Sequence, residues 1–376
     1  MKKCIIIPDS FKGTLSAVQI CDKMKQAVLR FFPDCQVRAV PVADGGEGTV
    51  DCFVYALGAE KVTVTSTGPF GEEVEASYAK MGDTAVIEMA SVTGLPLAEG
   101  KLNPRKASTF GLGKLILHAA DLGCKNIVIG LGGSCTNDAG TGMVRALGTK
   151  FFDKNGNEFS PCADELVQID HIDNSALEHR LKGISFTVMC DVDNPLYGKN
   201  GAAYVFAPQK GADEQCVRDL DQNLRALAAG IEKDLGKKVA DLPGAGAAGG
   251  MGAGCVAFLN GTLKAGIETV LELVGFDEML DGADVVFTGE GKIDSQSLRG
   301  KVIMGVASHG KKKGVPVVAV VGAIGEGAEE IYQYGVTSIF SINRTPEDFS
   351  VSRYKSEENL ERTMESILRL YRAVKK

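Results

Sequence analysis

"KCIIIPD" (residues 3–9) begins the chain with a continuous apolar run that ends in a proline and an acid. An uninterrupted apolar run is typical of a parallel strand that is buried on both faces of its sheet. We expect a helix next, because Ser16 and Gln19 make an S-x-x-Q capping box and apolar residues then recur at helical spacing up to Phe31. Pro33 ends this helix.

Strand–helix alternation continues near both ends of the chain. The segment "CQVRAVPVAD" (35–44) predicts a second strand, and a helix over about 49–57 follows it. Near the C-terminus, three short apolar stretches predict strands: "GADVVFTGEG" (282–291), "VPVVAVVGAIG" (315–325) and "VTSIFSINR" (336–344). These five units favour a single parallel sheet that is built from both chain ends, because such alternation requires right-handed crossovers.

The middle of the chain follows another pattern. Segments 60–67, 72–82 and 84–90 resemble an antiparallel meander, and 126–133 predicts a further strand. An amphipathic helix runs through Val217, Leu220, Leu224, Leu227 and Ile231. The fold class is therefore α/β with two domains. Residues 1–65 and 282–376 would form the parallel-sheet domain, and 66–281 would form a mixed α/β domain inserted into it.

Composition excludes several classes of protein. A chain of 376 residues is longer than one compact core usually holds, and its net charge of −7 argues against nucleic-acid or membrane partners. No apolar stretch approaches the ~20 residues that a membrane span needs. Ten cysteines without a CxxC pair predict reduced, mostly buried thiols and a cytoplasmic location, and four scattered histidines leave no zinc motif.

The carboxyl ends of the predicted parallel strands carry acids beside glycine and hydroxyl residues. These loops are "PDSFKGT" (8–14), "ADGGEGT" (43–49) and "TGEGKIDSQSLRGK" (288–301). Helix capping alone would explain any one of them. Three such loops, with Lys12, Lys292 and Arg299 among them, instead favour a ligand site, because open parallel sheets bind ligands at this edge.

The inserted domain has glycine-rich loops of its own. "GLGGSCTNDAGTGM" (130–143) follows a strand, and its small residues would let the backbone approach an anion. "GAGAAGGMGAG" (244–254) contains no lysine and is not a phosphate loop of the G-x-x-x-x-G-K-[ST] type; it is either a weak GxGxxG match or a close-packed or hinge segment. Asp191 and Asp193 follow an apolar strand, which suits Mg²⁺. The alternative is an Asx-turn that initiates Asn194-Pro195.

Anion-binding loops that also carry carboxylates indicate phosphoryl transfer. Such an enzyme needs amides for nucleotide phosphates, acids for Mg²⁺, a carboxylate near the attacking hydroxyl and a cation for an acidic substrate. Two alternatives stay open at this point. A flavin- or nucleotide-dependent oxidoreductase would place GxGxxG directly after the first strand, where this chain has "PDSFKG". A two-domain ligand sensor would explain a cleft but not so many acids.

Six segments together resemble the type-1 glycerate kinase family. They are "PDSFKGTLSA" (8–17), "PVADGGEGT" (41–49), "GLGGSCTNDAGTGM" (130–143), "CDVDNP" (190–195), "APQKGA" (207–212) and "TGEGKIDSQSLRGK" (288–301). The resemblance implies ATP-dependent phosphorylation of D-glycerate with Mg²⁺. The 2- or the 3-hydroxyl could be the acceptor, and the sequence leaves both a monomer and a homodimer open. It also implies a flavodoxin- or Rossmann-like domain. Cys135 and Ala139 stand where the family usually has Ala and often Gly, and an exposed Cys135 would make the loop sensitive to thiol reagents.

The matched motifs supply the candidate site residues. We expect glycerate to bind between the sheet edge and the inserted domain, with hinges near 66 and 281. Asp44 or Asp191 would orient the hydroxyl, with Lys12 as a further catalytic residue. The other roles are shared as follows: Ser10, Phe11, Lys12, Arg299, Asp294 and Ser295 for substrate; Gly132, Gly133, Ser134, Thr136 and Asn137 for ATP; and Glu47, Glu290 and Asp193 for the metal.

Overall fold

The computed structural model describes residues 1–43, 45–46, 48–295 and 302–374. The chain divides into two compact units. Unit 1 contains Met1–Asp44, Asp51–Gly58 and Ile267–Lys376, and unit 2 contains Gly45–Val50 and Ala59–Gly266. These boundaries differ from the expected domain boundaries, which lie between residues 65 and 66 and between residues 281 and 282. Strand β3 (Glu60–Thr67) pairs with a strand of unit 2 along its whole length, whereas α11 (Phe276–Leu280) belongs to unit 1.

Unit 1 contains a five-stranded sheet made from both chain ends, in the order β16-β14-β12-β1-β2. Every neighbouring pair is parallel, which confirms the predicted parallel sheet. In chain order the strands lie 2-1-3-4-5, the flavodoxin-like arrangement, and the direction of winding reverses between β1 and β12. Their bounds are β1 (Lys3–Pro8), β2 (Gln36–Ala39), β12 (Val285–Gly289), β14 (Val317–Val321) and β16 (Val336–Ser341).

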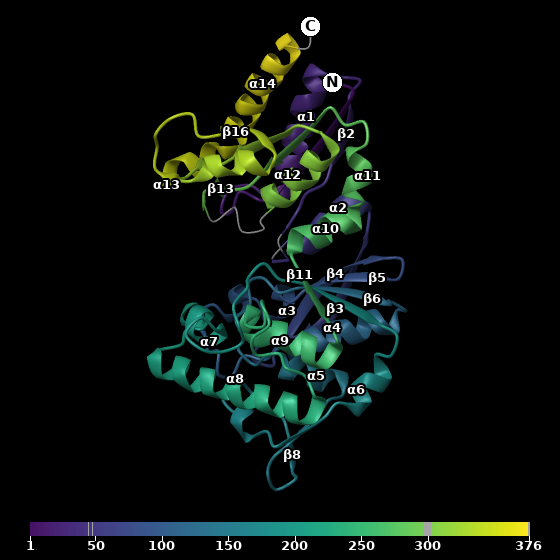
Figure 1. Ribbon diagram of the computed structural model, residues 1–376, viewed down its shortest axis with the longest axis vertical. Coiled ribbons are helices and arrows are strands. Elements are labelled where there is room, and N and C mark those ends of the chain that lie inside the picture. Colours follow the sequence, from purple (N-terminus) through teal and green to yellow (C-terminus); the bar gives the residue numbers. More distant parts are fainter. Residues whose placement is uncertain (44, 47, 296–301, 375–376) are drawn as a thin grey trace. The chain divides into compact units, whose positions relative to one another are not determined.

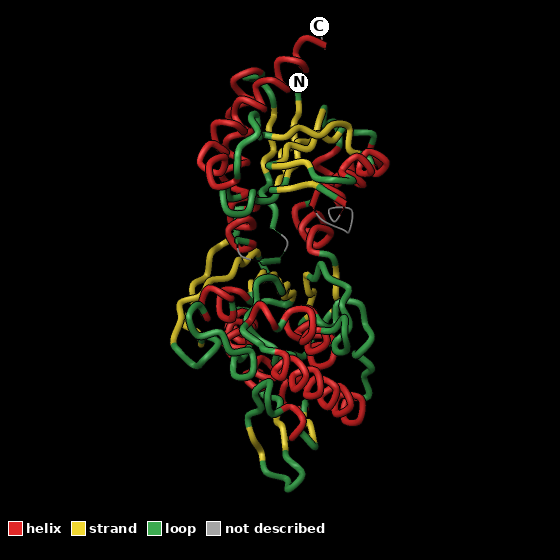
Figure 2. The backbone as a smooth tube through the Cα atoms, turned by 90° about the vertical axis from the view of Figure 1, so that its left-hand side faces the viewer, coloured by secondary structure: helices red, strands yellow, loops and turns green. Residues whose placement is uncertain are grey.

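Helices cover both faces of the sheet of unit 1, as the red helices beside the yellow strands in Figure 2 show. Helix α1 (Ala17–Phe31) has the predicted capping box, in which Ser16 and Gln19 bond each other's backbone amides, and it packs beside α14 (Ser356–Val374). Cys4 and Ile6 share a core cluster with these two helices. The alternate side chains of β1 are equally buried, and α12 (Val302–Lys313) packs against β1 and β12. The remaining elements are α2 (Thr49–Leu57), α10 (Gly266–Val274), α13 (Phe349–Ser352), η5 (Ala328–Tyr334), η6 (Arg353–Lys355) and the pair β13 (Lys292–Ile293) and β15 (Ala323–Ile324).

Unit 2 contains a six-stranded mixed sheet (Figure 1). Its strands are hydrogen-bonded in the order β11-β10-β6-β5-β4-β3. Strands β3, β4 and β5 form the predicted antiparallel meander, and β5, β6, β10 and β11 pair in parallel. The carboxyl ends of these four strands therefore lie at one edge of the sheet. The bounds are β4 (Glu73–Met81), β5 (Thr84–Glu88), β6 (Asn126–Gly130), β10 (Ser185–Met189) and β11 (Thr262–Lys264), with a small sheet of β7 (Lys150–Phe152), β8 (Glu158–Phe159) and β9 (His171–Asp173).

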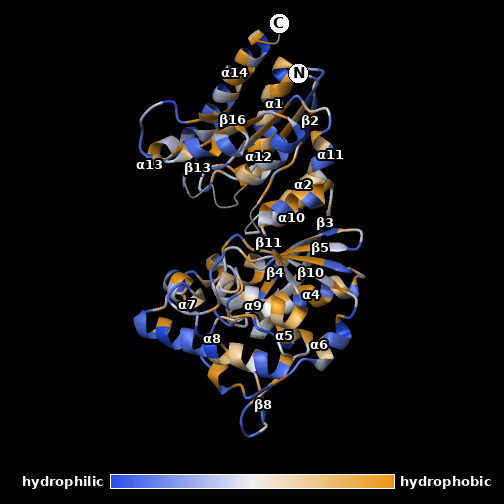
Figure 3. Cartoon of the chain, viewed as in Figure 1, coloured by the Kyte–Doolittle hydropathy of each residue, from blue (hydrophilic) through white to orange (hydrophobic). Residues whose placement is uncertain are grey.

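Two helices of unit 2 differ in how they are buried. Helix α8 (Glu214–Leu235) is amphipathic and buries all five apolar residues that its periodicity predicted, whereas α9 (Ala247–Leu259) is apolar on all sides and almost fully buried. Figure 3 shows the contrast, with α8 largely blue and α9 white to orange. The other helices are α3 (Ala90–Thr93), η1 (Leu95–Ala98), α4 (Phe110–Asp121), α5 (Thr141–Leu147), η2 (Leu166–Gln168), α6 (Ser175–Arg180), α7 (Ala202–Phe206) and η3 (Pro208–Lys210).

Among the residues that the structure describes, no helix has the length and apolar character that crossing a bilayer would require. All ten cysteines are free thiols; eight are buried, and Cys162 and Cys190 are partly buried. The burial of most thiols agrees with the sequence prediction.

Candidate active site

In unit 1, the loops after β1 and β12 meet where the sheet changes its direction of winding. The amide of Asp9 donates to the carbonyl oxygen of Gly289 at 2.8 Å. A Cβ placed on Gly291 would lie 3.3 Å from the amide nitrogen of Lys12. The two predicted loops, almost 280 positions apart in sequence, are therefore neighbours at the edge where flavodoxin-like sheets bind ligands.

The side chains of the first loop differ in exposure. Ser10 is partly buried, with its amide donating to Asp9 Oδ1 at 2.6 Å, and Lys12 is exposed. Phe11, predicted to contact substrate, is 2% exposed and belongs to the core cluster of unit 1. Its ring thus anchors the loop in the core. Glu290, which follows β12 in the second loop, is buried, with 5% of its surface exposed.

Asp294 and Ser295 continue the second loop. Lys292 Nζ lies 3.0 Å from Asp294 Oδ2, and the amide of Ser295 donates to the carbonyl oxygen of Glu326 at 3.1 Å. Asp294 is partly buried and Ser295 is exposed. Three further predicted residues, Asp44, Glu47 and Arg299, lie outside the described residues.

In unit 2, the glycine loop after β6 lies directly against residues 45 and 46. The amide of Gly132 donates to the carbonyl oxygen of Gly45 at 3.1 Å. A Cβ on Gly130 would lie 2.2 Å from that oxygen, and one on Gly132 would lie 2.6 Å from Gly46 Cα. These glycines are therefore needed for backbone contact between two loops, in addition to any contact with an anion.

The glycine loop turns its polar side chains inward. Ser134 is 5% exposed, and Thr136 and Asn137 are fully buried. Thr136 Oγ1 and both polar atoms of the Asn137 side chain have no hydrogen-bond partner among the described residues. Because a buried polar atom without a partner costs about 1–3 kcal/mol, these three atoms are candidates for hydrogen bonds to a ligand or an ordered water.

Lys210, which ends η3, contacts the glycine loop, and the sequence prediction did not single it out. Its side chain is 1% exposed, and Nζ donates to Ser134 Oγ at 3.0 Å and to the carbonyl oxygen of Thr136 at 2.6 Å. The available signal was the segment "APQKGA" (207–212), in which this lysine is the only charged residue.

Asp138 was also missed, and its role is structural. Its carboxylate accepts from the amide and hydroxyl of Thr109 at 2.8 and 2.9 Å, and from the amides of Gly140 and Gly142 at 3.2 and 3.3 Å. Burial raises the pKa of Asp138, and these hydrogen bonds oppose that shift. The carboxylate therefore holds the first turns of α4 and α5 beside the glycine loop.

The glycine run 244–254 is a close-packed segment, the second of its two predicted readings. Ala248, Gly249 and Gly250 have positive φ angles at the start of α9. A Cβ on Gly249 would lie 2.1 Å from the carbonyl oxygen of Thr136, and the amide of Ala139 donates to the carbonyl oxygen of Gly249 at 3.1 Å. The run 244–254 therefore packs closely against the backbone of the loop that carries Asn137.

Asp191 and Asp193 follow β10, and both are exposed. Asp191 Oδ1 accepts from the amide of Gly266 at 2.7 Å. Glu88, at the end of β5, is a buried carboxylate at the same sheet edge, and it accepts from the amide of Val50. Glu88 ends an apolar strand in the sequence, but it was not among the predicted site residues. Within the described ranges, no three or more His, Cys, Asp or Glu side chains group as a metal site.

Cys135 is not the exposed thiol that would sensitise the loop to reagents. It is 1% exposed, and burial raises its pKa to about 11. A thiol in this environment stays protonated near neutral pH and is a poor nucleophile.

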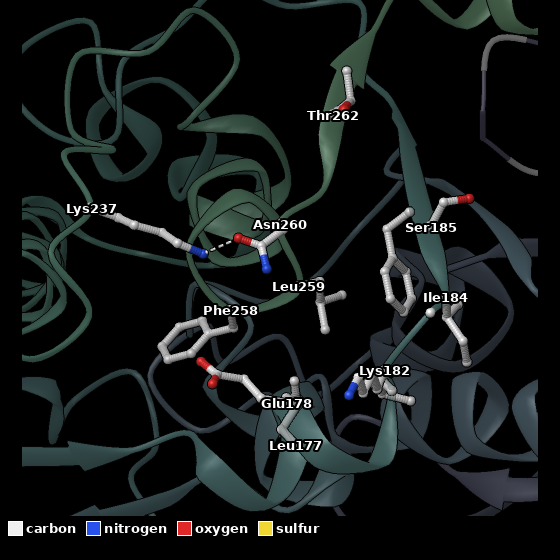
Figure 4. Close-up of a pocket in the computed structure, with 13 residues that line it drawn as sticks. Leu177, Glu178, Lys182, Ile184, Ser185, Lys237, Phe258, Leu259, Asn260 and Thr262 are labelled. Carbon is white, nitrogen blue, oxygen red and sulfur yellow. Dashed lines mark hydrogen bonds between the residues drawn. The ribbon is translucent and has the colours of Figure 1, made fainter.

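A pocket of about 480 Å³ lies at the opposite end of the strands of unit 2 (Figure 4). Residues Ile184–Phe186 at the start of β10 and Thr262 at the start of β11 line it. Lys237 Nζ donates to Asn260 Oδ1 at 2.6 Å and to the carbonyl oxygen of Ala257 at 2.5 Å, so this lysine holds the C-terminus of α9. The pocket is thus remote from the glycine loop along the strands.

Comparison with known proteins points to one enzyme family. The model of the glycerate kinase family matches residues 4–372. A protein named glycerate kinase from Halalkalibacterium halodurans is 45% identical, with 91% of each chain covered. A protein named glycerate 2-kinase from Escherichia coli K12 is 46% identical, with 90% of each chain covered.

A solved structure agrees as well. The crystal structure described as a glycerate kinase 2 from Salmonella typhimurium LT2 is 40% identical and covers 100% of this chain and 99% of its own, with a TM-score of 0.89. Sequence, family model and fold therefore point the same way, and this chain belongs to the glycerate kinase family.

Proposed function

We propose that this protein phosphorylates D-glycerate with ATP in a Mg²⁺-assisted reaction. The observation that carries the proposal is the family match over residues 4–372. The 2-hydroxyl is the proposed acceptor, because the relative from Escherichia coli K12 is named a glycerate 2-kinase and is 46% identical. The product would then be 2-phosphoglycerate.

Glycerate is small and acidic, so its site needs a cation and hydroxyl partners. Lys12, exposed at the edge of the sheet of unit 1, is proposed to bind the substrate carboxylate together with Arg299. Ser10, Asp294 and Ser295 would bind the hydroxyl groups. Phe11 would contribute by fixing the loop, since its ring lies in the core.

The ATP phosphates are proposed to bind the glycine loop, at Gly132, Gly133, Ser134, Thr136 and Asn137. Two features support this assignment. Gly133 is exposed at the loop surface, and the buried polar atoms of Thr136 and Asn137 have no partner among the described residues. Glycine loops after a strand are common phosphate sites, because backbone amides can approach the anion closely.

A carboxylate must orient the attacking hydroxyl, and we assign this role to Asp44 or Asp191. Mg²⁺ would neutralise charge on the transferred phosphoryl group, with Glu47, Glu290 and Asp193 as its candidate ligands. Mg²⁺ commonly binds through one or two carboxylates plus substrate phosphates. A site of that kind is compatible with the described residues, which contain no cluster of three or more acids, cysteines or histidines able to hold a metal.

Two further assignments belong to this proposal. We infer that the two units are the two domains of the enzyme, and that it works in the cytoplasm, where its ten free thiols stay reduced.

The test is a coupled assay of ADP release with D-glycerate, followed by phosphorus NMR of the product. We expect ADP release that depends on glycerate and Mg²⁺, and a resonance for phosphate on the 2-oxygen. A product phosphorylated on the 3-oxygen would overturn the choice of hydroxyl. No ADP release with glycerate would overturn the proposed activity and leave the ligand-sensor alternative.

A further inference from the structure

Lys210 is a buried cation for which no carboxylate lies within ion-pair distance among the described residues. Its ammonium donates to a hydroxyl, Ser134 Oγ at 3.0 Å, and to the carbonyl oxygen of Thr136 at 2.6 Å. The side chain is only 1% exposed. Transferring an ammonium from water to such a position is expensive without a counter-charge. Two neutral acceptors on one loop do not supply one.

Among the residues that the structure describes, the charged and titratable groups that face this ammonium are Cys135 and Asp138. The thiol of Cys135 is neutral near pH 7, because burial raises its pKa to about 11. The carboxylate of Asp138 is not in ion-pair contact with Lys210; it accepts hydrogen bonds from Thr109, Gly140 and Gly142. Burial lowers the pKa of Lys210 to about 8, and the two neighbours offset this only in part.

The loop above the ammonium offers further donors. Thr136 Oγ1 and the amide of the Asn137 side chain are buried without a hydrogen-bond partner among the described residues. A positive charge next to a loop with hydrogen-bond donors that have no partner among the described residues suits an anionic oxygen group. The same loop is where the proposed function places a reactant.

We propose that Lys210 is a positioning residue that fixes Ser134 and Thr136 and supplies the counter-charge for an anionic group of a reactant at the loop Gly132–Asn137. This inference rests on the proposed function and deepens it. The shared ligand chemistry is an anionic oxygen group, which both the phosphates of ATP and the carboxylate of glycerate provide. The experiment therefore tests the two reactants separately.

The proposal fixes the sign of a pH effect. An anion at the loop favours the charged lysine, so binding raises the pKa of Lys210 above its value of about 8 and takes up protons. Affinity for that anion is then highest below this pKa and falls as the pH rises through it. Cys135 stays protonated over the same interval. Burial raises the pKa of Asp138, and its hydrogen bonds from Thr109, Gly140 and Gly142 favour the charged form.

The test measures binding to the full-length protein by isothermal titration calorimetry. The probes are D-glycerate alone and the Mg²⁺ complex of a non-hydrolysable ATP analogue, at about pH 7.5 and about pH 9.5, on either side of the lysine pKa. Pairs of buffers with different ionisation enthalpies give the protons taken up. The variants are Lys210→Met and the matched control Lys237→Met, which removes another lysine that binds backbone carbonyl oxygens in unit 2, at the far end of the strands (Figure 4).

We expect wild type and Lys237→Met to lose affinity for one of the two probes at the higher pH and to take up protons on binding it. Lys210→Met should bind that probe about 10-fold or more weakly at the lower pH, with no proton uptake beyond that of the probe itself. The probe that shows this behaviour identifies the anion.

Other outcomes overturn the inference. One is that the affinity of wild type for both probes does not change with pH. The other is that Lys210→Met binds both probes with the affinity and the proton uptake of wild type. If Lys210→Met fails to fold, the proton uptake of wild type decides alone. Wild type that phosphorylates glycerate but shows no Lys210 effect would refute only this inference. Wild type that binds neither probe would refute the proposed function as well.

Discussion

Gly130 lies against the backbone of Gly45: a Cβ on Gly130 would be 2.2 Å from the carbonyl oxygen of Gly45. Gly45 has a φ angle of 85° and precedes α2, whereas Gly130 ends β6. Two loops that are 85 positions apart thus touch through their main chains. The backbone of Gly45 and Gly46 therefore lies directly against the glycine loop after β6.

We expect Gly130→Ala to destabilise the protein by about 2 kcal/mol or more, because a backbone oxygen must move to admit the methyl group. The matched control is Gly230→Ala within α8, where a new Cβ would meet Ile172 at an ordinary 3.7 Å. That change should be neutral or stabilising by up to ~1 kcal/mol. Urea unfolding of both variants checks the pair. Equal stability of Gly130→Ala and wild type would contradict the described contact.

The sequence predicted well the features that depend on local order. The capping box of α1 could be predicted because it depends only on the four consecutive residues from Ser16 to Gln19. The parallel sheet followed from apolar runs at both chain ends, and its flavodoxin-like order agrees with the family resemblance. The meander 60–67, 72–82 and 84–90 followed from alternation and turns.

The missed features depend on contacts between distant segments. In the sequence, Lys210 resembles a surface lysine next to a turn. Its burial against Ser134 results from contacts between segments that are far apart in the sequence. Asp138 reads as a loop residue, and only the fold gives it the amides of Thr109 and Gly142.

Asp138→Asn should destabilise the protein by about 2–4 kcal/mol. An amide nitrogen would replace one carboxylate oxygen and face N–H groups that need an acceptor, inside a fully buried site. The control is Asp153→Asn, at an exposed turn, where Asp153 accepts from Asn155 and Asn157. We expect a clearly smaller loss there. Comparable unfolding midpoints for the two variants would show that Asp138 does not hold α4 and α5.

We expect His309 to make the stability of unit 1 depend on pH. Burial lowers its pKa, but hydrogen bonds to Asp277 and Glu268 outweigh burial and hold the pKa above its usual 6.5. A raised histidine pKa gives stabilisation that is complete below the unfolded value and is lost as the pH rises through the folded value. Thermal unfolding of wild type should therefore show a decrease in midpoint from about pH 6 to about pH 8 that His309→Gln lacks. If the unfolding midpoints of wild type and His309→Gln changed with pH in the same way, the contacts of His309 with Asp277 and Glu268 would not contribute to stability as described.

Only two of the ten thiols are accessible enough to react quickly. Cys162 and Cys190 are partly buried, and the other eight are buried. We expect a chromogenic disulfide reagent to modify at most these two in the native protein and all ten after denaturation. In a variant with Cys162→Ser and Cys190→Ser, fast modification should disappear. Rapid loss of activity through Cys135 in that variant would contradict its burial in the glycine loop.

Asp191→Asn separates a catalytic role from a structural one. Asp191 Oδ1 accepts from the amide of Gly266 at 2.7 Å, and the oxygen of an asparagine side chain can accept the same bond. The thermal midpoint should therefore stay close to that of wild type. If Asp191 orients the substrate hydroxyl, loss of its charge should lower kcat at least ~100-fold. Asp241→Asn, an exposed acid elsewhere in unit 2, should leave both quantities unchanged. Turnover near the wild-type rate in Asp191→Asn would remove this residue from the mechanism and leave Asp44 as the proposed base.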